Sequence, residues 1–200
     1  MGAPLHLIIP GIDGSGPDHW QSRWVRERPD CRCVNLGRWH DPDRDLWVDR
    51  LQQAIVGARR REIVLVAHSL GCLLVTWWVQ ACAGQGACAG VKAAMLVAPC
   101  DPEAAHDPRL RRHGPLPLAG PLPFPALVVA SSNDPYAAPD RAAAFARGLG
   151  AQLVTVGAAG HINAESGLGR LTEGEALLAT FEDRVLRRTA RAPRTAGARQ

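Results

Sequence analysis

Hydrophobic and polar positions divide this chain into two kinds of segment that alternate along its length. Short apolar runs rich in valine, isoleucine and leucine are typical of strands buried on both faces of a sheet. The longer segments between them carry apolar residues at every third or fourth position, which is typical of helices with one buried face. The predicted strands cover residues 5–9, 33–36, 63–67, 92–98, 125–131 and 152–156, and the predicted helices cover 17–28, 43–60, 71–83, 139–149 and about 171–186.

The regular alternation of strands and helices predicts a three-layer α/β fold, in which helices cover both faces of a six-stranded parallel sheet. Right-handed crossovers give the strand order 2-1-3-4-5-6, with the strand over 63–67 near the centre. In such a sheet, ligands bind at the carboxyl ends of the strands. Residues 99–123 are rich in proline, glycine and charge and show no periodicity, so we expect a long loop or a small, partly helical excursion there, and no large lid.

The composition is that of an ordinary globular protein, with 200 residues of which 46% are hydrophobic and 21% are charged. This length fits a single domain, which we place at 1–186. The net charge of +4 is modest, and part of it lies in residues 187–200, which we expect to form a basic, disordered tail. Because the tail has no aromatic residues among its arginines, we do not expect nucleic-acid binding.

The cysteines and the first residues indicate a reduced protein of the cytoplasm. The chain has six cysteines but no Cys-x-x-Cys pair and no zinc-like spacing of cysteine and histidine, so we expect neither a disulfide framework nor a metal site. The amino terminus lacks the basic and apolar segments of a secretory signal. Residues 63–83 are apolar enough to resemble a membrane span, but they contain His68, Ser69 and Gln80. A buried strand followed by a buried helix gives the same hydropathy, and we expect no membrane contact.

Residues 63–71 read Ile-Val-Leu-Val-Ala-His-Ser-Leu-Gly, a buried strand that ends in a sharp turn carrying Ser69. Small residues at Ala67 and Gly71 let the strand and the next helix pass closely, and the Leu70 amide is left free to bind a developing oxyanion. This is the pattern of the nucleophile elbow of α/β-hydrolases, with its first glycine replaced by Ala67. In the alternative interpretation, Ser69 only caps a helix after an ordinary turn of a parallel sheet.

An acid and a histidine follow Ser69 in the order that this fold requires, each on the loop after a later strand. Asp134 follows the strand over 125–131, and His161 follows the strand over 152–156. We expect Asp134 to orient the imidazole of His161, which takes the proton of Ser69 and later gives it to the leaving group. Taken alone, Asp134 is also typical of a turn before Pro135, and His161 of an ordinary loop histidine. Their order and placement together favour a catalytic triad.

The loop after the first strand, Pro-Gly-Ile-Asp-Gly-Ser-Gly over 10–16, is the candidate for the second half of an oxyanion hole. Its glycines let the backbone fold back toward Ser69, and we predict that the Ile12 amide acts beside that of Leu70. A phosphate-binding loop is the alternative, but the glycine order differs from Gly-x-Gly-x-x-Gly and no Gly-Lys-Ser/Thr occurs. We therefore expect no nucleotide and no other cofactor.

Several motifs carry a family resemblance across about residues 5–186. They are Pro10-Gly11, His19-Trp20, His68-Ser69-Leu70-Gly71-Cys72, Ser131-Ser132-Asn133-Asp134-Pro135-Tyr136 and Gly160-His161-Ile162-Asn163. In these the chain resembles the small serine hydrolases of the retinoblastoma-binding protein nine and YdeN-like family. The resemblance implies a compact α/β-hydrolase with Ser69, Asp134 and His161 as its triad. The Leu-x-Cys-x-Glu motif behind the family's name lacks its glutamate here, so we carry over no protein partner.

The sequence thus predicts a serine hydrolase that cleaves small carboxylic esters or related acyl compounds through an acyl-enzyme on Ser69, with a small-molecule acyl substrate as its partner. His19 and Trp20 are candidates for the lining of the acyl pocket, although packing beneath the oxyanion loop explains them equally well. The alternative is a binding or regulatory protein that keeps the hydrolase fold without useful turnover, because a fold does not determine function.

Overall fold

The structure is a computed structural model that describes residues 3–82, 88, 90–117 and 120–191, with only the backbone of 186–191. Within these residues, six strands form one parallel sheet in the order β2-β1-β3-β4-β5-β6, as predicted. The strands are β1 (Leu5–Ile9), β2 (Cys31–Cys33), β3 (Ile63–His68), β4 (Val91–Val97), β5 (Ala126–Ala130) and β6 (Gln152–Thr155). The helices are α1 (Trp20–Glu27), α2 (Arg44–Ala58), α3 (Leu70–Ala81), α4 (Pro108–Arg111), α5 (Pro139–Gly148) and α6 (Thr172–Arg191), with a 3-10 turn η1 (Ala164–Ser166).

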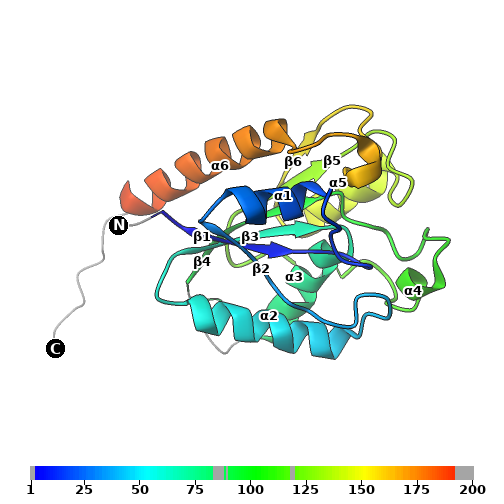
Figure 1. The fold of residues 1–200 in the computed structure, drawn as a ribbon, viewed down its shortest axis with the longest axis horizontal. Helices are drawn as coiled ribbons and strands as arrows, with labels where there is room; N and C mark the ends of the chain where they lie inside the picture. Colours follow the sequence, from blue (N-terminus) through cyan, green and yellow to red (C-terminus); the bar gives the residue numbers. More distant parts are fainter. Residues whose placement is uncertain (1–2, 83–87, 89, 118–119, 192–200) are drawn as a thin grey trace.

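The helices form a layer on each face of the sheet, which confirms the three-layer fold. Figure 1 shows α1 and α6 on one face and α2 and α3 on the other. Successive side chains of β3 alternate between the two hydrophobic cores, with Val64 and Val66 in the core under α1 and α6 and Leu65 in the core under α2, α3 and α5. Because both faces of β3 are buried, all of its residues are apolar up to the point where the strand reaches the edge of the sheet.

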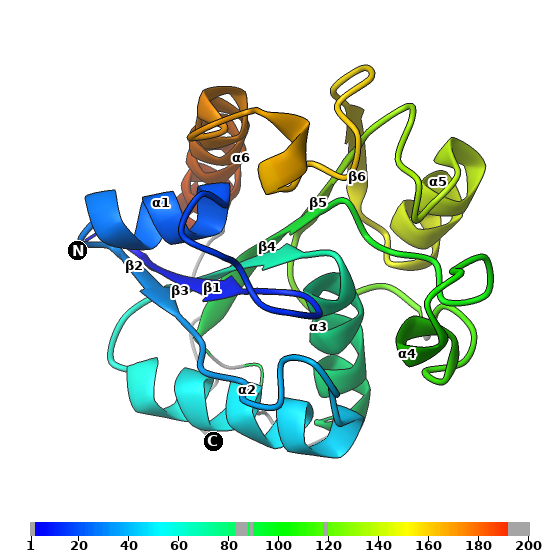
Figure 2. The same cartoon turned by 45° about the vertical axis from the view of Figure 1, so that its right-hand side comes forward.

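The parallel strands all deliver their chain to the same edge of the sheet, and the loops that follow them gather there. Figure 2 shows the loop after β1 passing beside the start of α3, with α4 at the same end of the molecule. The expected small helical excursion within 99–123 is α4, which Asp107 caps by accepting a hydrogen bond from the Arg109 amide at 2.8 Å. Leu110 anchors α4 in the core with 1% of its surface exposed.

The second strand lies earlier than the sequence predicted. β2 covers Cys31–Cys33 instead of residues 33–36. Val34 and Leu36 are 3% and 0% exposed because they pack in the core beside α2, although they lie outside the strand. The Val34 amide still donates to the Ile8 carbonyl of β1 at 2.9 Å, but the strand itself ends at Cys33, so the prediction of a strand over 34–36 was wrong and the apolar character of these residues reflects side-chain burial.

Two helix ends also differ from the prediction by three residues or more. α1 begins at Trp20, three residues after the expected start at 17, because the His19 side chain caps it by accepting a hydrogen bond from the Gln21 amide at 3.2 Å. α6 continues to Arg191, beyond the expected end at 186. The rest of the expected basic tail, 192–200, lies outside the described residues.

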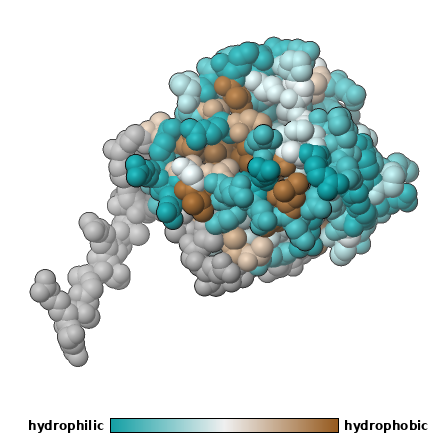
Figure 3. All heavy atoms as spheres, turned by 60° about the horizontal axis from the view of Figure 1, so that its bottom comes forward, coloured by the Kyte–Doolittle hydropathy of each residue, from teal (hydrophilic) through white to brown (hydrophobic). Residues whose placement is uncertain are grey.

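The outer surface carries no large apolar region on the face shown in Figure 3, where hydrophobic side chains form small separate patches in a largely hydrophilic surface. None of the helices in the described part of the chain is both long and apolar enough to span a membrane. The apolar segment around Ser69 is a buried strand and a buried helix, as expected.

Candidate active site

Ser69 forms a sharp turn between β3 and α3, with backbone angles of φ 54° and ψ −123°. A residue with a side chain rarely adopts a positive φ, so this turn is strained and needs support from its neighbours. The Ser69 amide donates to the Val97 carbonyl of β4 at 3.0 Å. Gly71 makes the turn possible, because a Cβ there would lie 2.5 Å from the Ile9 oxygen and 2.7 Å from the Pro10 oxygen.

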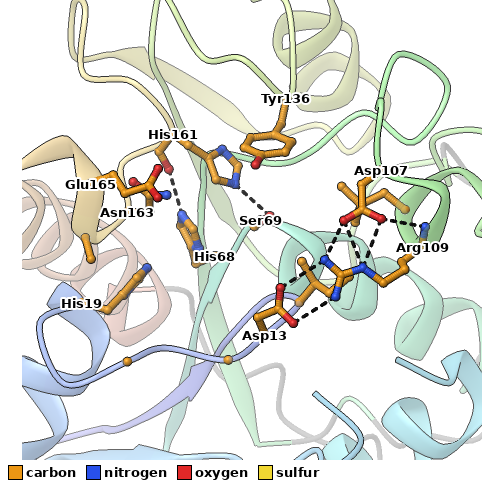
Figure 4. Close-up of a pocket in the computed structure, with 15 residues that line it drawn as sticks. Asp13, His19, His68, Ser69, Asp107, Arg109, Tyr136, His161, Asn163 and Glu165 are labelled. Atoms are coloured by element: carbon orange, nitrogen blue, oxygen red, sulfur yellow. Dashed lines mark hydrogen bonds and ion pairs between the residues drawn. The ribbon is translucent and has the colours of Figure 1, made fainter. Parts of the chain in front are cut away.

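The structure brings Ser69, His161 and Asp134 into one hydrogen-bonded chain (Figure 4). The Ser69 hydroxyl donates to Nε2 of His161 at 2.9 Å, and Nδ1 of His161 donates to the Asp134 carboxylate, with both oxygens at 2.9 Å. The side chains of His161 and Asp134 are only 8% and 3% exposed. A buried hydroxyl, imidazole and carboxylate in this arrangement can pass a proton from the serine to the histidine.

The loops that carry Asp134 and His161 are joined by two polar side chains. The Ser131 hydroxyl accepts a hydrogen bond from the Ala159 amide at 2.9 Å, and Oδ1 of Asn133 accepts one from the Gly160 amide at 2.7 Å. Sequence reasoning did not assign these two residues a role, since serine and asparagine are common in any turn. Their positions just before Asp134 were the available signal.

Two further histidines lie next to the triad, His68 beside His161 and His19 beside His68 (Figure 4). Nε2 of His68 donates to the His161 carbonyl at 2.9 Å, and the His19 ring lies 4.8 Å from the His68 ring. Burial, followed by the nearby charge of His161, lowers the pKa of His19 to about 4 and the pKa of His68 well below its usual range. Both rings are therefore neutral at neutral pH, and His68 acts as a hydrogen-bond donor to the histidine loop.

Of the two residues expected in the pocket lining, only His19 lines the cavity described below. Trp20 is 1% exposed and packs in the core under α1. Its indole donates to the Ile162 carbonyl at 2.8 Å, so it supports the histidine loop from below. A helix start with adjacent ring side chains looks the same in the sequence whether a ring faces a ligand or the core.

The loop after β1 lies directly against the serine turn. A Cβ on Gly11 would meet the Ser69 Cβ at 2.9 Å and the Leu70 amide nitrogen at 3.2 Å. Ile12 is the next residue and lines the cavity. Leu70 is the first residue of α3, so its amide has no acceptor within the helix. The two amides that the sequence singled out therefore lie on the two segments that flank Ser69.

A cavity of about 350 Å³ opens above Ser69 between these loops and α4. Much of its wall is polar. The polar and charged lining residues besides Ser69, His68 and His161 are Asp13, His19, Asp107, Arg109, Tyr136, Asn163 and Glu165. Tyr136 places its ring 4.4 Å from the ring of His161. The cavity is large enough for a small organic molecule but is not a long apolar channel.

Within the described residues, one group brings three metal-ligating side chains together, and it lies on β1 and β2 away from this cavity. The ligand atoms of His6, Asp30 and Cys31 lie within 4.8 Å of one another. The Arg28 guanidinium already binds two of them, at 2.8 Å from Asp30 and 3.3 Å from His6. Burial raises the pKa of the Cys31 thiol to about 12, so it remains protonated. This group does not fit a metal ion.

Comparisons with known proteins identify the family of the chain. The serine hydrolase family model matches residues 6–180. A protein of Pectobacterium atrosepticum described as a YdeN-like hydrolase is 34% identical, with a TM-score of 0.78 over 90% of this chain and 91% of its own. The ydeN gene product of B. subtilis is 19% identical, with a TM-score of 0.68 over 90% of this chain and 100% of its own.

A more distant fold match is Est1E from Butyrivibrio proteoclasticus, solved with ferulic acid, which is 18% identical with a TM-score of 0.58 over 88% of this chain and 90% of its own. The comparison with curated proteins found no significant match. The family model covers most of the chain, and the Pectobacterium protein matches it in sequence and fold along nearly its whole length. The chain therefore belongs to the serine hydrolase family, among the YdeN-like hydrolases.

Proposed function

We propose that this serine hydrolase cleaves small carboxylic esters or related acyl compounds through an acyl-enzyme on Ser69. The observation that carries the proposal is the buried chain of hydrogen bonds from the Ser69 hydroxyl through His161 to Asp134, with 2.9 Å at each step. A nucleophile, a base and a residue that orients the base are the groups that acyl transfer requires.

In the first half-reaction, Oγ of Ser69 attacks the carbonyl carbon of the substrate while Nε2 of His161 takes the hydroxyl proton. The electron pair of the carbonyl bond moves to its oxygen. When this intermediate collapses, the bond to the leaving group breaks and the leaving group takes the proton from His161. Asp134 stabilises the protonated imidazole throughout. The product of this step is an ester of Ser69.

In the second half-reaction, a water molecule attacks the acyl carbon and gives a proton to His161. Collapse of the second intermediate returns that proton to Oγ of Ser69 and releases the carboxylic acid. In both half-reactions Nε2 of His161 carries the proton while Nδ1 stays bonded to Asp134. His161 keeps this position because its loop is held by hydrogen bonds to His68, Ser131 and Asn133. Every step uses protein side chains and water, so EDTA is expected to leave the rate unchanged.

The amides of Ile12 and Leu70 bind the negative oxygen of both intermediates. Amides fixed in advance stabilise the transition state more than the substrate, and one such donor contributes about 10²–10³ in kcat. The support for this role is that the loop after β1 packs against the serine turn at Gly11. Both segments directly follow strands of the sheet, β1 and β3, which hold the two donors in place before the reaction begins.

The cavity favours short acyl groups. Its volume of about 350 Å³ and its charged wall offer little apolar surface for a long hydrocarbon chain. We expect 4-nitrophenyl esters of two to six carbons, roughly, to be cleaved with a higher kcat/KM than esters of about twelve carbons or more. A clear preference for the long chains would contradict this substrate class while leaving the acyl-enzyme mechanism intact.

Intact mass spectrometry after treatment with a fluorophosphonate tests the nucleophile. The protein should gain the mass of one phosphonyl group, and the Ser69→Ala variant should gain none. With 4-nitrophenyl butyrate, Ser69→Ala should lose activity by about a thousand-fold or more, with an unchanged thermal melt. Ser132→Ala, at an exposed serine of the acid loop, is the matched control and should behave as the parent.

Two results would overturn the proposal in different ways. Activity of Ser69→Ala within a few-fold of the parent would show that Ser69 is not the nucleophile. Labelling of Ser69 without turnover of any ester would favour the alternative of a binding or regulatory protein that keeps the fold.

A further inference from the structure

Arg109 in α4 stands in the wall of the active-site cavity with every donor group engaged (Figure 4). Its two terminal nitrogens donate to the two oxygens of Asp13 at 3.0 and 3.1 Å. Nε and one terminal nitrogen donate to Asp107, the latter at 2.7 Å, and the other terminal nitrogen donates to the His40 carbonyl at 3.2 Å. The five N–H groups of a guanidinium are thus all satisfied by the protein.

An arginine in the wall of a cavity is often the anchor for an anionic substrate, and here it is not free to be one. The paired carboxylates of Asp107 and Asp13 raise the pKa of Arg109, and Arg109 lowers the pKa of each of them. A substrate carboxylate would have to displace one of these bidentate partners and would meet the other as a repelling charge. The arrangement is that of a clamp between protein segments.

The clamp joins α4 to the loop that flanks the serine. Asp13 directly follows Ile12, and its backbone has a φ of 62°, which an aspartate adopts only at some cost. The Asp13 amide donates to the Trp39 carbonyl at 2.8 Å, which fixes the same loop from the side of β2. One residue earlier than Ile12, Gly11 touches Ser69. Movement of Asp13 would therefore be passed directly to the adjacent Ile12 and would shift the position of its amide.

We propose that Arg109 is a positioning residue, which holds the loop over 10–16 through Asp13 so that the Ile12 amide faces the oxygen that becomes negative in the reaction. This proposal rests on the proposed acyl-transfer function. A misplacement of about 1 Å in a catalytic group costs up to about a hundred-fold in rate. Since the oxyanion forms only during the reaction, loss of the clamp should lower kcat and leave KM nearly unchanged.

The test compares a neutral substrate and an anionic substrate of similar length, 4-nitrophenyl hexanoate and mono-4-nitrophenyl adipate. For Arg109→Met we expect kcat to fall about ten-fold to a hundred-fold with both substrates, and the rate of fluorophosphonate labelling to fall in parallel. If instead KM rises for the adipate ester alone with kcat retained, Arg109 is a substrate anchor and the proposal is wrong. An unchanged kcat with both substrates would also overturn it.

Three more variants decide whether the effect passes through Asp13. Asp13→Asn removes the carboxylate but keeps a residue that tolerates positive φ. The double variant Asp13→Asn with Arg109→Met should lose no more activity than the worse of the two single variants. If the activity losses of the two single variants multiply in the double variant, Arg109 acts by another route. Arg109→Lys keeps the charge without the bidentate geometry and should resemble Arg109→Met, which covers the case in which the methionine variant does not fold.

Arg111→Met, at an exposed arginine of the same helix, is the matched control and should keep the parent activity. Failure of the parent protein to cleave 4-nitrophenyl hexanoate would contradict the proposed function itself, and is thereby distinguished from failure of the clamp.

Discussion

The contact between the loop after β1 and the serine turn can be tested by adding one carbon atom. In Gly11→Ala the new Cβ would lie 2.9 Å from the Cβ of Ser69 and 3.2 Å from both the His68 oxygen and the Leu70 nitrogen. Two carbon atoms at rest are about 3.5–4.0 Å apart, so the two segments must separate by about 0.6–1 Å. Ser69 cannot retreat without breaking its bond to Val97, so we expect the loop to move.

The displacement sets the magnitude of the effect. A shift of about 1 Å in a catalytic group costs up to about a hundred-fold, so kcat should fall by about 30- to 100-fold with little change in KM. Added volume in a packed region also destabilises by about 1–3 kcal/mol. For a chain of this length, each kcal/mol lowers the melting temperature by about 2–4 °C.

The assay is the steady-state hydrolysis of 4-nitrophenyl butyrate beside a thermal melt of the same sample. Gly57→Ala in α2 is the matched control, because a Cβ there meets no atom within 4 Å. It should keep its kcat and gain up to about 1 kcal/mol, as alanine favours the helix over glycine. A Gly11→Ala enzyme with normal kcat would refute the idea that the position of this loop governs the chemistry.

Three other predictions follow from single contacts. Trp20→Phe removes the donor to the Ile162 carbonyl and should cost about 1–3 kcal/mol in denaturant unfolding and also lower kcat. Trp78→Phe, which loses a similar bond to the Gln52 side chain between α2 and α3 and does not line the cavity, should lose stability alone, and equal kcat values for both variants would exclude a role of Trp20 in positioning. Burial lowers the pKa of His19 from 6.5 to about 4, so the unfolded chain takes up a proton first and stability is lost as the pH falls below 6.5. Between pH 6.5 and 5 this loss is about 2 kcal/mol and should vanish in His19→Asn, as measured by urea midpoints. Because burial lowers the pKa values of His19 and His68, both rings stay neutral above pH 5, so neither should add a proton uptake to the acid limb of the pH–rate profile, and a two-proton limb there would contradict this.

The sequence predicted those parts of the site that depend only on where the strands end, because an apolar run along the chain also fixes the place of the next loop in the fold. Ser69, Asp134 and His161 each follow an apolar run, and in a parallel sheet all such runs end at one edge. Placing each residue after a strand was therefore sufficient to bring them together. The order of the strands followed in the same way from the handedness of the crossovers.

The sequence did not predict the side-chain contacts between residues that lie far apart along the chain. Arg109 is one of three arginines in the polar segment 99–123, and nothing in the sequence around it distinguishes a guanidinium bound to Asp13, 96 residues away, from one in solvent. His68 likewise bonds to a carbonyl 93 residues further along the chain. Val34 and Leu36 have the composition of a strand but take their burial from α2. Such contacts depend on how distant segments pack in three dimensions, and the spacing of apolar residues along the chain does not identify them.

Residues with strained backbone angles surround the cavity, and local sequence preferences do not predict such angles. Asp13, Ser69, Ala98 and Ile162 all have positive φ between 48° and 62°, and each lies at the carboxyl edge of the sheet around the cavity. Such residues cost about 1–3 kcal/mol each and persist only where their surroundings hold them. Each amide donates to a carbonyl, at 2.8 Å for Asp13, 3.0 Å for Ser69, 2.8 Å for Ala98 and 3.2 Å for Ile162. The first three of these carbonyls belong to a neighbouring strand or loop, so the sheet and its loops hold the strained residues in place. The conformations that these residues prefer locally are therefore overridden at the positions where the site is built.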